Sequence, residues 1–560
     1  MTEAPTPGGF NLSTVFRTVA EAVPEHEAVV WRDVRLTYRD MDARIDGVAH
    51  HLVERGLGCH AERAGLAGHE SGQDHLGLYL RNGNEYLEAM VAGYRARVAP
   101  FNVNFRYVEE ELLYLLTDAR TRALVYAAEF APQVAAVRDR LPDLTVLIQV
   151  ADDSGHDLLP GAVDYEEVTA TPAPAGGMPT PSGDDLFVLY TGGTTGMPKG
   201  VLWRNDDIYV TSMGGTPFGT DEPHASYAAI AEHARTQGGG MRLLMIPPLM
   251  HGAAQWSTFH TFTGGGAIVF PDDVRRLDPA DALRTAARER VVSIPVVGDA
   301  VALPLIEEVE RGGHDLSGLA AFNNGGAPLT PGVRDRILTA LPHILVMDAA
   351  GASETGLQMS SMSLKGMEAG TAEFSPVRAT AVVDDLRTRR LGPGEGAGWL
   401  AQGGRVPLGY LGDAAKTAAT FPVIDGERWS VPGDRAELLD DGRIRLLGRD
   451  GVTVNSGGEK IFVEEVERAM AAHPAVRDVV VAGRPSQRWG SEVVAIVQLE
   501  AGHQAVTDDE LLAECGRHVA RYKVPKAVLR LPQVVRSPAG KADYRWAKQV
   551  AVESVGVSGG

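Results

Sequence analysis

At residues 190–200 the chain has the sequence Tyr190-Thr191-Gly192-Gly193-Thr194-Thr195-Gly196-Met197-Pro198-Lys199-Gly200. The apolar run 186–190 has the length and composition of a buried strand, so the glycines follow a strand end, where α/β sheets bind their ligands. Glycine permits tight turns and leaves backbone N–H groups bare toward an anion. We therefore expect a cradle of amides, threonine hydroxyls and one ammonium group that suits a polyphosphate.

Two other interpretations of this segment are weaker. A Walker A loop requires Lys directly after its last Gly, followed by Ser or Thr, and the spacing here differs. An ordinary glycine-rich turn would not need the Thr194-Thr195 pair or the Pro198-Lys199-Gly200 sequence that accompany the glycines.

The segment resembles the phosphate-binding signature of the adenylate-forming superfamily, which comprises acyl-CoA synthetases, luciferases and the adenylation domains of peptide synthetases. Relatives usually have Ser where this chain has Gly193, so one phosphate-facing hydroxyl is absent here while the amide cradle is kept. The resemblance implies that the phosphates of ATP are bound by Thr191, Gly192, Gly193, Thr194, Thr195, Gly196 and Lys199.

Composition indicates a large protein of more than one domain. A chain of 560 residues exceeds what one hydrophobic core usually organises. The net charge of −20 argues against a general affinity for nucleic acid or anionic lipid. Two cysteines, Cys59 and Cys515, fit no disulfide framework and no zinc or redox spacing. No signal peptide or membrane-spanning run is recognisable, so we expect a cytoplasmic protein without integral membrane association.

Strand-like runs alternate with amphipathic segments, which predicts an α/β fold. A capping box at Thr37–Asp40 predicts the start of a helix that runs to Gly56. The Pro- and Gly-rich segment 170–183 is interpreted as a linker, and the glycine-rich segment 392–398 as a hairpin or surface turn. Strands are expected at 144–150, 243–246, 267–270, 291–297 and 344–347.

The resemblance covers nearly the whole chain, from Thr37 to Lys541, with the motifs in family order. It implies a large N-terminal domain over residues 1–448, built from parallel-rich sheets covered by helices, with a small β subdomain. Residues 449–451 are the implied hinge, and residues 452–560 the small, mobile α+β domain. Within that domain we expect a helix at 463–467 and strands at 479–482 and 493–499.

Two further motifs, Asn323–Leu329 and Asp348–Gly356, look like the adenine-side loops of the family. Glu354 is expected to hold Mg²⁺, since a carboxylate near the phosphates anchors a hard cation that bridges their oxygens. A solvated loop acid is the competing interpretation. Relatives usually carry an aromatic residue at Ala350 and Thr at Ser353, so stacking on adenine must come from elsewhere or be weaker. The implied adenine-side contacts are Gly325, Gly326, Ala327, Pro328, Ala350, Gly351 and Ser353.

The remaining family motifs lie toward the C-terminus. Asp434 resembles the acid that holds the ribose hydroxyls, a task for acceptor-only oxygens. Arg449 looks like the second ribose contact, directly before the hinge. The segment Arg536–Lys541 resembles the family loop that carries the catalytic lysine, which implies that role for Lys541. A lysine that follows Ser-Pro-Ala-Gly projects from a tight turn, so it can reach across a cleft into another domain's site. A solvated loop lysine is its weaker interpretation.

The resemblance implies a two-step reaction that uses ATP, Mg²⁺ and coenzyme A. The carboxylate of a small-molecule acid attacks the α-phosphate of ATP, while Mg²⁺ on Glu354, the amides of residues 192–200 and Lys541 offset the developing charge. The small domain then swings about the hinge, and the thiol of coenzyme A displaces AMP. Local motifs look closest to actinobacterial CoA ligases for fatty acids and steroid side chains, so a hydrophobic acid is the expected substrate.

His251 marks the region that the family uses for the acyl group. The small residues near it, including Gly264, Gly265 and Gly266, indicate room for a long or bulky apolar acid. A gating role and a buried structural role are equally supported for His251.

Three rival functions stay open from the sequence. An acyl-AMP ligase would load a carrier protein, an adenylating diazotase would use nitrite and an aryl amine, and a nucleotide sensor would have kept only the fold. Retention of Glu354 and Lys541 makes the sensor the weakest of these. Assembly as a homodimer, the identity of the acid and the resting orientation of the small domain are also open.

Overall fold

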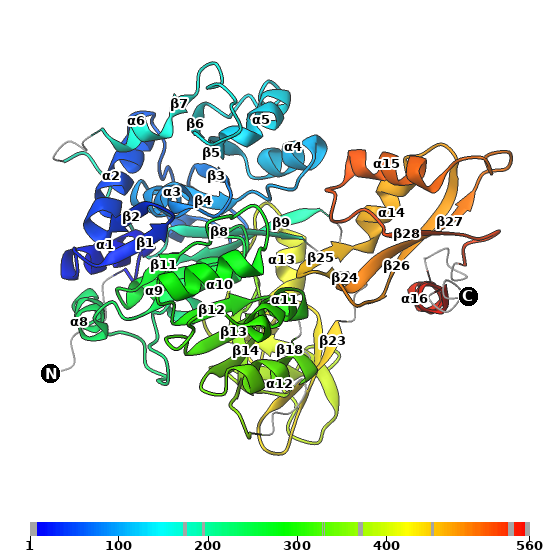
Figure 1. Cartoon of the computed structure of the whole chain (residues 1–560). Helices are drawn as coiled ribbons and strands as arrows, with labels where there is room; N and C mark the ends of the chain where they lie inside the picture. Colours follow the sequence, from blue (N-terminus) through cyan, green and yellow to red (C-terminus); the bar gives the residue numbers. More distant parts are fainter. Residues whose placement is uncertain are drawn as a thin grey trace.

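The computed structural model describes residues 8–171, 176–192, 197–326, 329, 331–367, 373–449, 453–535 and 543–554. Figure 1 shows a large lobe, defined here as the described residues up to 449, and a small lobe, residues 453–554, at its side. The large lobe runs from α1 (Leu12–Ala22) to β23 (Ile444–Arg449) and the small lobe from β24 (Thr453–Ser456) to α16 (Tyr544–Glu553). Within the described ranges, no helix has the length and apolar character needed to cross a membrane.

The first sheet of the large lobe has eight strands in the order β19-β9-β8-β4-β3-β5-β6-β7. The strands from β8 to β7 are parallel, whereas β9 and β19 add antiparallel strands at one edge. Helix α3 (Asn84–Arg95) packs against β3 and β4, and α2 (Tyr38–Glu54) packs against α3. The bounds are β3 (His75–Tyr79), β4 (Ala99–Asn102), β5 (Thr121–Ala127), β6 (Val146–Val150), β7 (Val163–Asp164), β8 (Leu186–Gly192), β9 (Pro198–Arg204) and β19 (Gly409–Tyr410).

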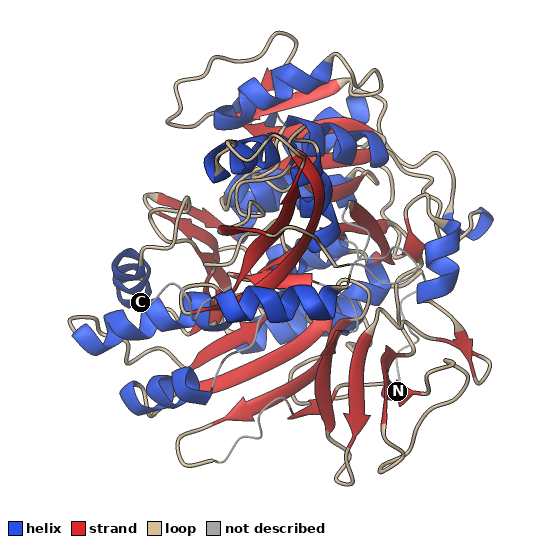
Figure 2. Cartoon of the chain, turned by 90° about the vertical axis from the view of Figure 1, so that its right-hand side faces the viewer, coloured by secondary structure: helices blue, strands red, loops and turns tan. Residues whose placement is uncertain are grey.

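The second sheet of the large lobe has 13 strands and changes character along its width. From β1 to β14 neighbouring strands are parallel, and beyond β14 they are antiparallel. Figure 1 shows β18 and β23 of this antiparallel part in the lower part of the large lobe, and Figure 2 shows the strands at the bottom of the molecule from the side. The bounds are β1 (Glu27–Trp31), β2 (Val34–Thr37), β10 (Arg242–Leu244), β11 (Ala267–Val269), β12 (Ser293–Val296), β13 (Ala321–Gly325), β14 (Leu345–Ala352), β15 (Gly356–Ser363), β16 (Glu373–Pro376), β17 (Thr380–Val383), β18 (Ala397–Gln402) and β22 (Asp434–Leu438).

The small lobe is a three-stranded sheet between two helical layers. Alternate residues of a strand face opposite sides: Val479 and Val481 pack toward α14 (Val463–Ala471) and α15 (Asp508–His518), whereas Val480 and Ala482 pack toward α16. A hairpin of β24 and β25 (Glu459–Phe462) projects from it. The sheet strands are β26 (Val476–Ser486), β27 (Gly490–Leu499) and β28 (Ala527–Arg530).

The predicted fold class is confirmed, and the five strands predicted in the large lobe correspond to β6, β10, β11, β12 and β14. The helix predicted from Thr37 is α2, with the Thr37–Asp40 capping box formed, and it ends at Glu54. Strand β14 continues to Ala352, five residues beyond the predicted end at Met347, because β15 pairs with it antiparallel. The segment 392–398 is a turn that leads into β18, as predicted. Within the predicted linker, residues 172–175 lie outside the described ranges.

Candidate active site

The predicted phosphate-binding segment joins two antiparallel strands. β8 ends at Gly192, and Thr191 is the register partner of Lys199 on β9. Asn102 fixes this end of β8, because its side chain donates to the Tyr190 carbonyl at 2.9 Å and accepts from the Tyr190 amide at 2.8 Å. The strand before the glycines was predicted, whereas the return strand after them was not. Four predicted phosphate contacts lie outside the described residues: Gly193, Thr194, Thr195 and Gly196.

Glu354 lies on the tight turn between β14 and β15 and is 9% exposed. The turn is held from two sides, since Trp203 Nε1 donates to the Ser353 carbonyl at 2.8 Å and Ser430 Oγ donates to the Glu354 carbonyl at 2.6 Å. Tyr410 OH donates to Glu354 Oε1 at 2.8 Å. Glu354 is therefore a buried carboxylate with a fixed orientation. The competing interpretation as a solvated loop acid is wrong.

Glycine is required at this turn because two backbone segments approach each other closely. A Cβ on Gly351 would collide with the Gly356 carbonyl oxygen. Gly356 itself has a φ of 68°, a conformation that other residues adopt only with strain. The two glycines thus allow β14 to reverse tightly into β15 and to present Glu354 at the strand ends.

The two predicted adenine-side motifs are neighbours in the sheet, because Gly325 at the end of β13 is the register partner of Ala349 on β14. Asn324 bridges the strand ends: its Oδ1 accepts from Gly298 N at 2.7 Å and its Nδ2 donates to Asp348 Oδ1 at 2.8 Å. Arg334 Nη2 completes this buried network at 2.8 Å from Asp348 Oδ2. The sequence analysis did not find this network.

The remaining adenine-side residues are described in part. Gly326 has a φ of 79°, which suits the turn that follows β13. Ala350 and Gly351 belong to strand β14 rather than to a loop, and Ala350 packs against the apolar cluster around Met359 and Leu400. Ala327 and Pro328 lie outside the described residues.

Lys199 forms an ion pair with Asp413, the residue that caps the N-terminus of α13 (Ala414–Thr420). The hydrogen bond from Lys199 lowers the pKa of Asp413, so the carboxylate stays ionised at neutral pH. Sequence reasoning found Lys199 but missed Asp413. The available signal was an N-cap pattern, an Asp before an alanine-rich helical segment.

The two predicted ribose contacts lie opposite each other. Asp434 begins β22 and is the register partner of Arg449, the last residue of β23. The side chain of Arg449 is not described. This pairing brings together two positions that are separated in the sequence, at the edge of the large lobe nearest the predicted hinge.

His251 lies at the N-terminus of α9 (Gly252–Thr263), and its side chain is 40% exposed, so it is not a buried structural residue. Its Nε2 lies 3.2 Å from Oε1 of Glu459, on β25 of the small lobe. Arg106 of the large lobe forms an ion pair with the same carboxylate. Burial raises the pKa of Glu459, but the charges of His251 and Arg106 outweigh it and lower this pKa to about 2.

The β24–β25 hairpin is the part of the small lobe that meets the large lobe at this point (Figure 1). Gly458, with a φ of 84°, lies so close to Val297 that a Cβ would stand 2.5 Å from Val297 Cγ1. Lys541, the predicted catalytic lysine, lies outside the described residues. No group of three or more His, Cys, Asp or Glu in the described ranges is arranged to hold a metal ion by itself.

Comparison with known proteins agrees with this two-lobe organisation. Residues 16–411 match the AMP-binding enzyme family and residues 465–541 match the AMP-binding enzyme C-terminal domain. The chain is 55% identical to the medium-chain acyl-CoA ligase Mig of Mycobacterium avium, over 98% of this chain and 99% of that protein. It is 37% identical to a 3-oxocholest-4-en-26-oate–CoA ligase of Rhodococcus rhodochrous, over 96% of this chain and 95% of that protein.

Solved structures share the fold at lower identity. The o-succinylbenzoate CoA synthetase MenE of Bacillus subtilis aligns with a TM-score of 0.76 and 21% identity, covering 96% of this chain and 98% of that chain. The amide bond synthetase McbA of Marinactinospora thermotolerans aligns with a TM-score of 0.75 and 20% identity, covering 97% of this chain and 100% of that chain.

A large lobe with a glycine-rich segment between two paired strands and a buried glutamate on a tight turn, with a small lobe beside it, agrees with the class of adenylate-forming enzymes. The predicted resemblance is confirmed. The chain belongs to the AMP-binding enzyme family.

Proposed function

We propose that the protein is an ATP-dependent acid:CoA ligase. It activates a hydrophobic carboxylic acid, either a fatty acid or a steroid side-chain acid, as acyl-AMP with release of pyrophosphate. It then transfers the acyl group to coenzyme A with release of AMP. The observation that carries this proposal is the 55% identity to a medium-chain acyl-CoA ligase over 98% of the chain, so a medium-chain fatty acid is the first substrate to test.

The nucleotide is assigned to the strand ends of the large lobe. Thr191 and Lys199, on either side of the glycine-rich hairpin, serve the phosphates, where a cation and backbone amides offset negative charge. Asp434 accepts hydrogen bonds from the ribose hydroxyls, with Arg449 opposite it. Gly325, Gly326 and the segment 350–353 border the adenine side, supported by their adjacency in β13 and β14.

Glu354 suits Mg²⁺ as part of a shared site. Mg²⁺ is usually held by one or two carboxylates together with substrate phosphates rather than by a complete protein cage. A single oriented carboxylate and the lack of a three-ligand cluster in the described ranges agree with this arrangement. When bound with ATP, the ion would neutralise charge on the phosphate oxygens.

Lys541 is assigned to the first step and His251 to the acyl side of the site. Replacing Lys541 with Ala should abolish pyrophosphate release from ATP and acid, while thioester formation from supplied acyl-AMP is spared, because the ammonium offsets charge only on the reacting phosphoryl group. Equal loss of both steps would rule out this role.

The function is tested by incubating the protein with a panel of acids and scoring AMP and pyrophosphate, with and without coenzyme A. AMP release that needs both a hydrophobic acid and coenzyme A is the expected result. Acyl transfer to a holo-carrier protein but not to coenzyme A would identify an acyl-AMP ligase. A diazonium product from nitrite and an aryl amine would identify a diazotase. The acid and coenzyme A are the proposed partners, and the cytoplasm, with its free coenzyme A and ATP, is the proposed location.

A further inference from the structure

The short segment after β19 contacts both residues that the proposed function assigns to the metal and phosphate side. Tyr410 ends β19, which pairs antiparallel with β9 through the register partners Gly409–Leu202 and Tyr410–Val201. Three residues further on, Asp413 forms the ion pair with Lys199. One segment of the chain therefore contacts Glu354 and Lys199 at once.

The Tyr410 side chain has little freedom. It is 3% exposed, its ring lies 5.9 Å from that of Phe421, and the Lys416 ammonium lies 5.4 Å from the ring centroid. The backbone is fixed as well, because Tyr410 N donates to Thr417 Oγ1 at 2.9 Å. The phenol oxygen is thus held at one position in the core of the large lobe.

The hydrogen bond from Tyr410 selects one orientation of the Glu354 carboxylate. The backbone of Glu354 is already fixed by Ser430, so the side-chain torsions are the freedom that remains. A hydrogen bond to an ionised carboxylate is stronger than one between neutral groups. It engages Oε1, and among the described residues no donor contacts Oε2.

We propose that Tyr410 is a positioning residue that aligns Glu354 to bind Mg²⁺ together with ATP. This inference rests on the proposed function, because it takes Glu354 as the metal-binding carboxylate. Asp413 forms an ion pair with Lys199 from the same segment.

The test is Tyr410→Phe, which keeps the ring, its packing and its contact with Lys416 and removes only the hydroxyl. The readouts are Mn²⁺ affinity, measured by electron paramagnetic resonance in the presence of a non-hydrolysable ATP analogue, and the metal dependence of pyrophosphate exchange. We expect Mn²⁺ to bind about tenfold more weakly, the size of one hydrogen bond to a charged group. Raised Mg²⁺ should restore most of the rate, and the KM for the acid should not change.

The matched control is Tyr79→Phe. Tyr79 is buried in the same lobe, and its hydroxyl has no hydrogen-bond partner in the described ranges, so its removal should leave metal binding unchanged. A double-mutant cycle with Glu354→Gln separates alignment from general stability. If Tyr410 acts through Glu354, Tyr410→Phe has no further effect on Mn²⁺ affinity once Glu354 is replaced.

Two outcomes would overturn the inference. One is unchanged Mn²⁺ affinity in Tyr410→Phe, even if its melting temperature falls. The other is an equal loss of affinity in the wild-type and Glu354→Gln backgrounds. A wild-type protein that forms no acyl-AMP from any acid would instead contradict the proposed function, which distinguishes the two failures.

Discussion

The proposed nucleotide side of the large lobe, around Glu354 and Lys199, and the interface between the lobes are built from different interactions. On the nucleotide side, Glu354 and Lys199 lie at the ends of strands in continuous sheets, and their partners Tyr410 and Asp413 come from the same lobe. At the interface, contacts between the lobes are mainly ion pairs and hydrogen bonds, and each buried apolar cluster of the described residues contains residues of one lobe only. Moving Tyr410 would disturb the packing of the buried apolar cluster of the large lobe, to which it belongs.

The interface has a buried polar centre. Lys523 Nζ of the small lobe donates to Glu465 Oε1 of the same lobe at 2.7 Å and to Glu111 Oε1, on α4 (Glu109–Asp118) of the large lobe, at 2.8 Å. The three side chains are each 4–5% exposed. Near it, Asn104 Nδ2 donates to Tyr522 OH at 3.2 Å. Buried ion pairs lose in desolvation much of what they gain in attraction. Such an interface can therefore form and separate at little net cost, which suits a small lobe that takes more than one orientation.

Removing the carboxylate on the nucleotide side should have the largest effect. We expect Glu354→Gln to lower pyrophosphate release from ATP and acid by ~10²–10³-fold, the size typical of one preorganised electrostatic contact. Thioester formation from supplied acyl-AMP should change only a few-fold. Glu395→Gln, at an exposed glutamate on the turn before β18, is the control. Normal pyrophosphate release in Glu354→Gln would show that Glu354 has no part in adenylation, and the proposed nucleotide side would then be wrong.

Removing the charge of Lys523 at the centre of the interface should have the next largest effect. We expect this effect on acyl transfer to coenzyme A rather than on adenylation. Lys523→Met leaves two buried carboxylates facing each other, and an unpaired buried charge costs about 3–5 kcal/mol. The arrangement in which the β24–β25 hairpin meets His251 should then be lost. Taking this arrangement as the one that serves acyl transfer, we expect at least a tenfold slower transfer to coenzyme A, with adenylation changed less than threefold.

The control for this change is Lys526→Met, three residues away and exposed. Adenylation and transfer rates should both be kept in that variant. A Lys523→Met protein in which both half-reactions fall equally would mean that the interface supports the fold as a whole rather than one orientation of the small lobe.

A smaller effect is expected at the rim of the same interface. Glu459→Gln removes the charge that pairs with Arg106 and faces His251, so we expect roughly a tenfold slower transfer step and an unchanged KM for ATP. Glu492→Gln, which breaks an ion pair with Arg484 inside the small lobe, should leave the transfer step alone. If the two variants behave alike, the contact between Glu459 and His251 has no special part in transfer.

Candidate site residues could be predicted from the sequence where they belong to motifs of contiguous residues. Glu354, Lys199 and Asp434 each stand in a motif of contiguous residues and could be singled out from the sequence, although the strand β9 that carries Lys199 was not predicted. Tyr410, Asp413 and Glu459 were missed as partners because they meet Glu354, Lys199 and His251 across 56, 214 and 208 residues of sequence. Such contacts depend on how strands are ordered in the sheets. The boundaries of the domains and the hinge at 449–451 stay predictions.

The antiparallel half of the second sheet was predicted only as a β subdomain. Its strands β16 and β17 have four residues each and are only partly buried, which leaves no strong apolar period in the sequence. The continuity of this half with β14 follows from the reversal at Gly351 and Gly356, which the sequence alone does not reveal.

The smallest effect that we expect is a pH dependence confined to the interface. Burial, and then the neighbouring charge of Glu111, raise the pKa of Glu465 to about 7, even though Lys523 lowers it. Glu465 and Lys523 form a neutral pair within the small lobe, so the approach of Glu111 adds a second negative charge. The associated arrangement therefore binds a proton. The stabilisation of the associated lobes by this proton is fully present below the ordinary pKa of a glutamate. It is lost as the pH rises through about 7, the pKa of Glu465 in the associated arrangement.

Other titratable groups lie around this centre, and one of them also changes the interface in the same pH range. Burial raises the pKa values of Tyr107 and Tyr522, and that of Cys515 to about 12, so these groups stay neutral, while Glu459 stays ionised. His518 is the exception at the rim. Its hydrogen bonds with Glu514 and then Glu110 raise its pKa, so its pair with Glu110 also weakens as the pH rises. The variant Glu110→Gln measures how much of the pH dependence comes from the pair of His518 and Glu110.

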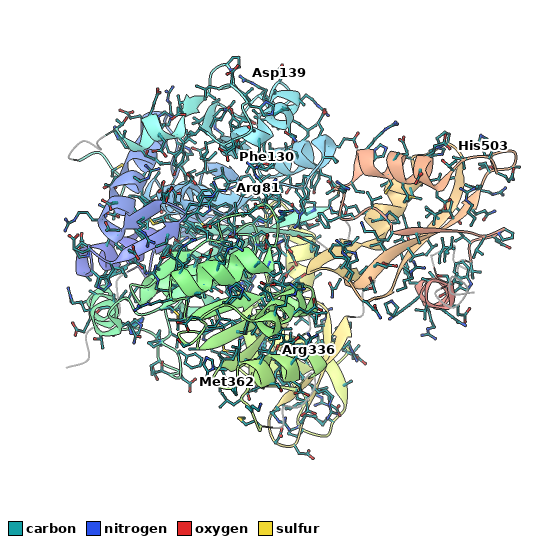
Figure 3. All side chains as sticks on the ribbon, viewed as in Figure 1. Arg81, Phe130, Asp139, Arg336, Met362 and His503 are labelled. Carbon is teal, nitrogen blue, oxygen red and sulfur yellow. The ribbon has the colours of Figure 1, made fainter. Side chains whose placement is uncertain are left out.

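The measurement is energy transfer between dyes on Cys residues introduced at Asp139 and His503, which lie on the surfaces of the two lobes (Figure 3), with Cys59 replaced by Ser. We expect the ratio of associated to separated lobes to fall as the pH is raised from 6 to 8, by at most about tenfold per unit for one proton. Glu111→Gln should flatten this dependence, because Lys523 then neutralises Glu465 alone. Glu109→Gln, exposed on the same helix, should retain it. Because Glu110→Gln removes the contribution of His518, a pH response that survives in the double variant Glu110→Gln/Glu111→Gln would show that the buried centre binds no proton.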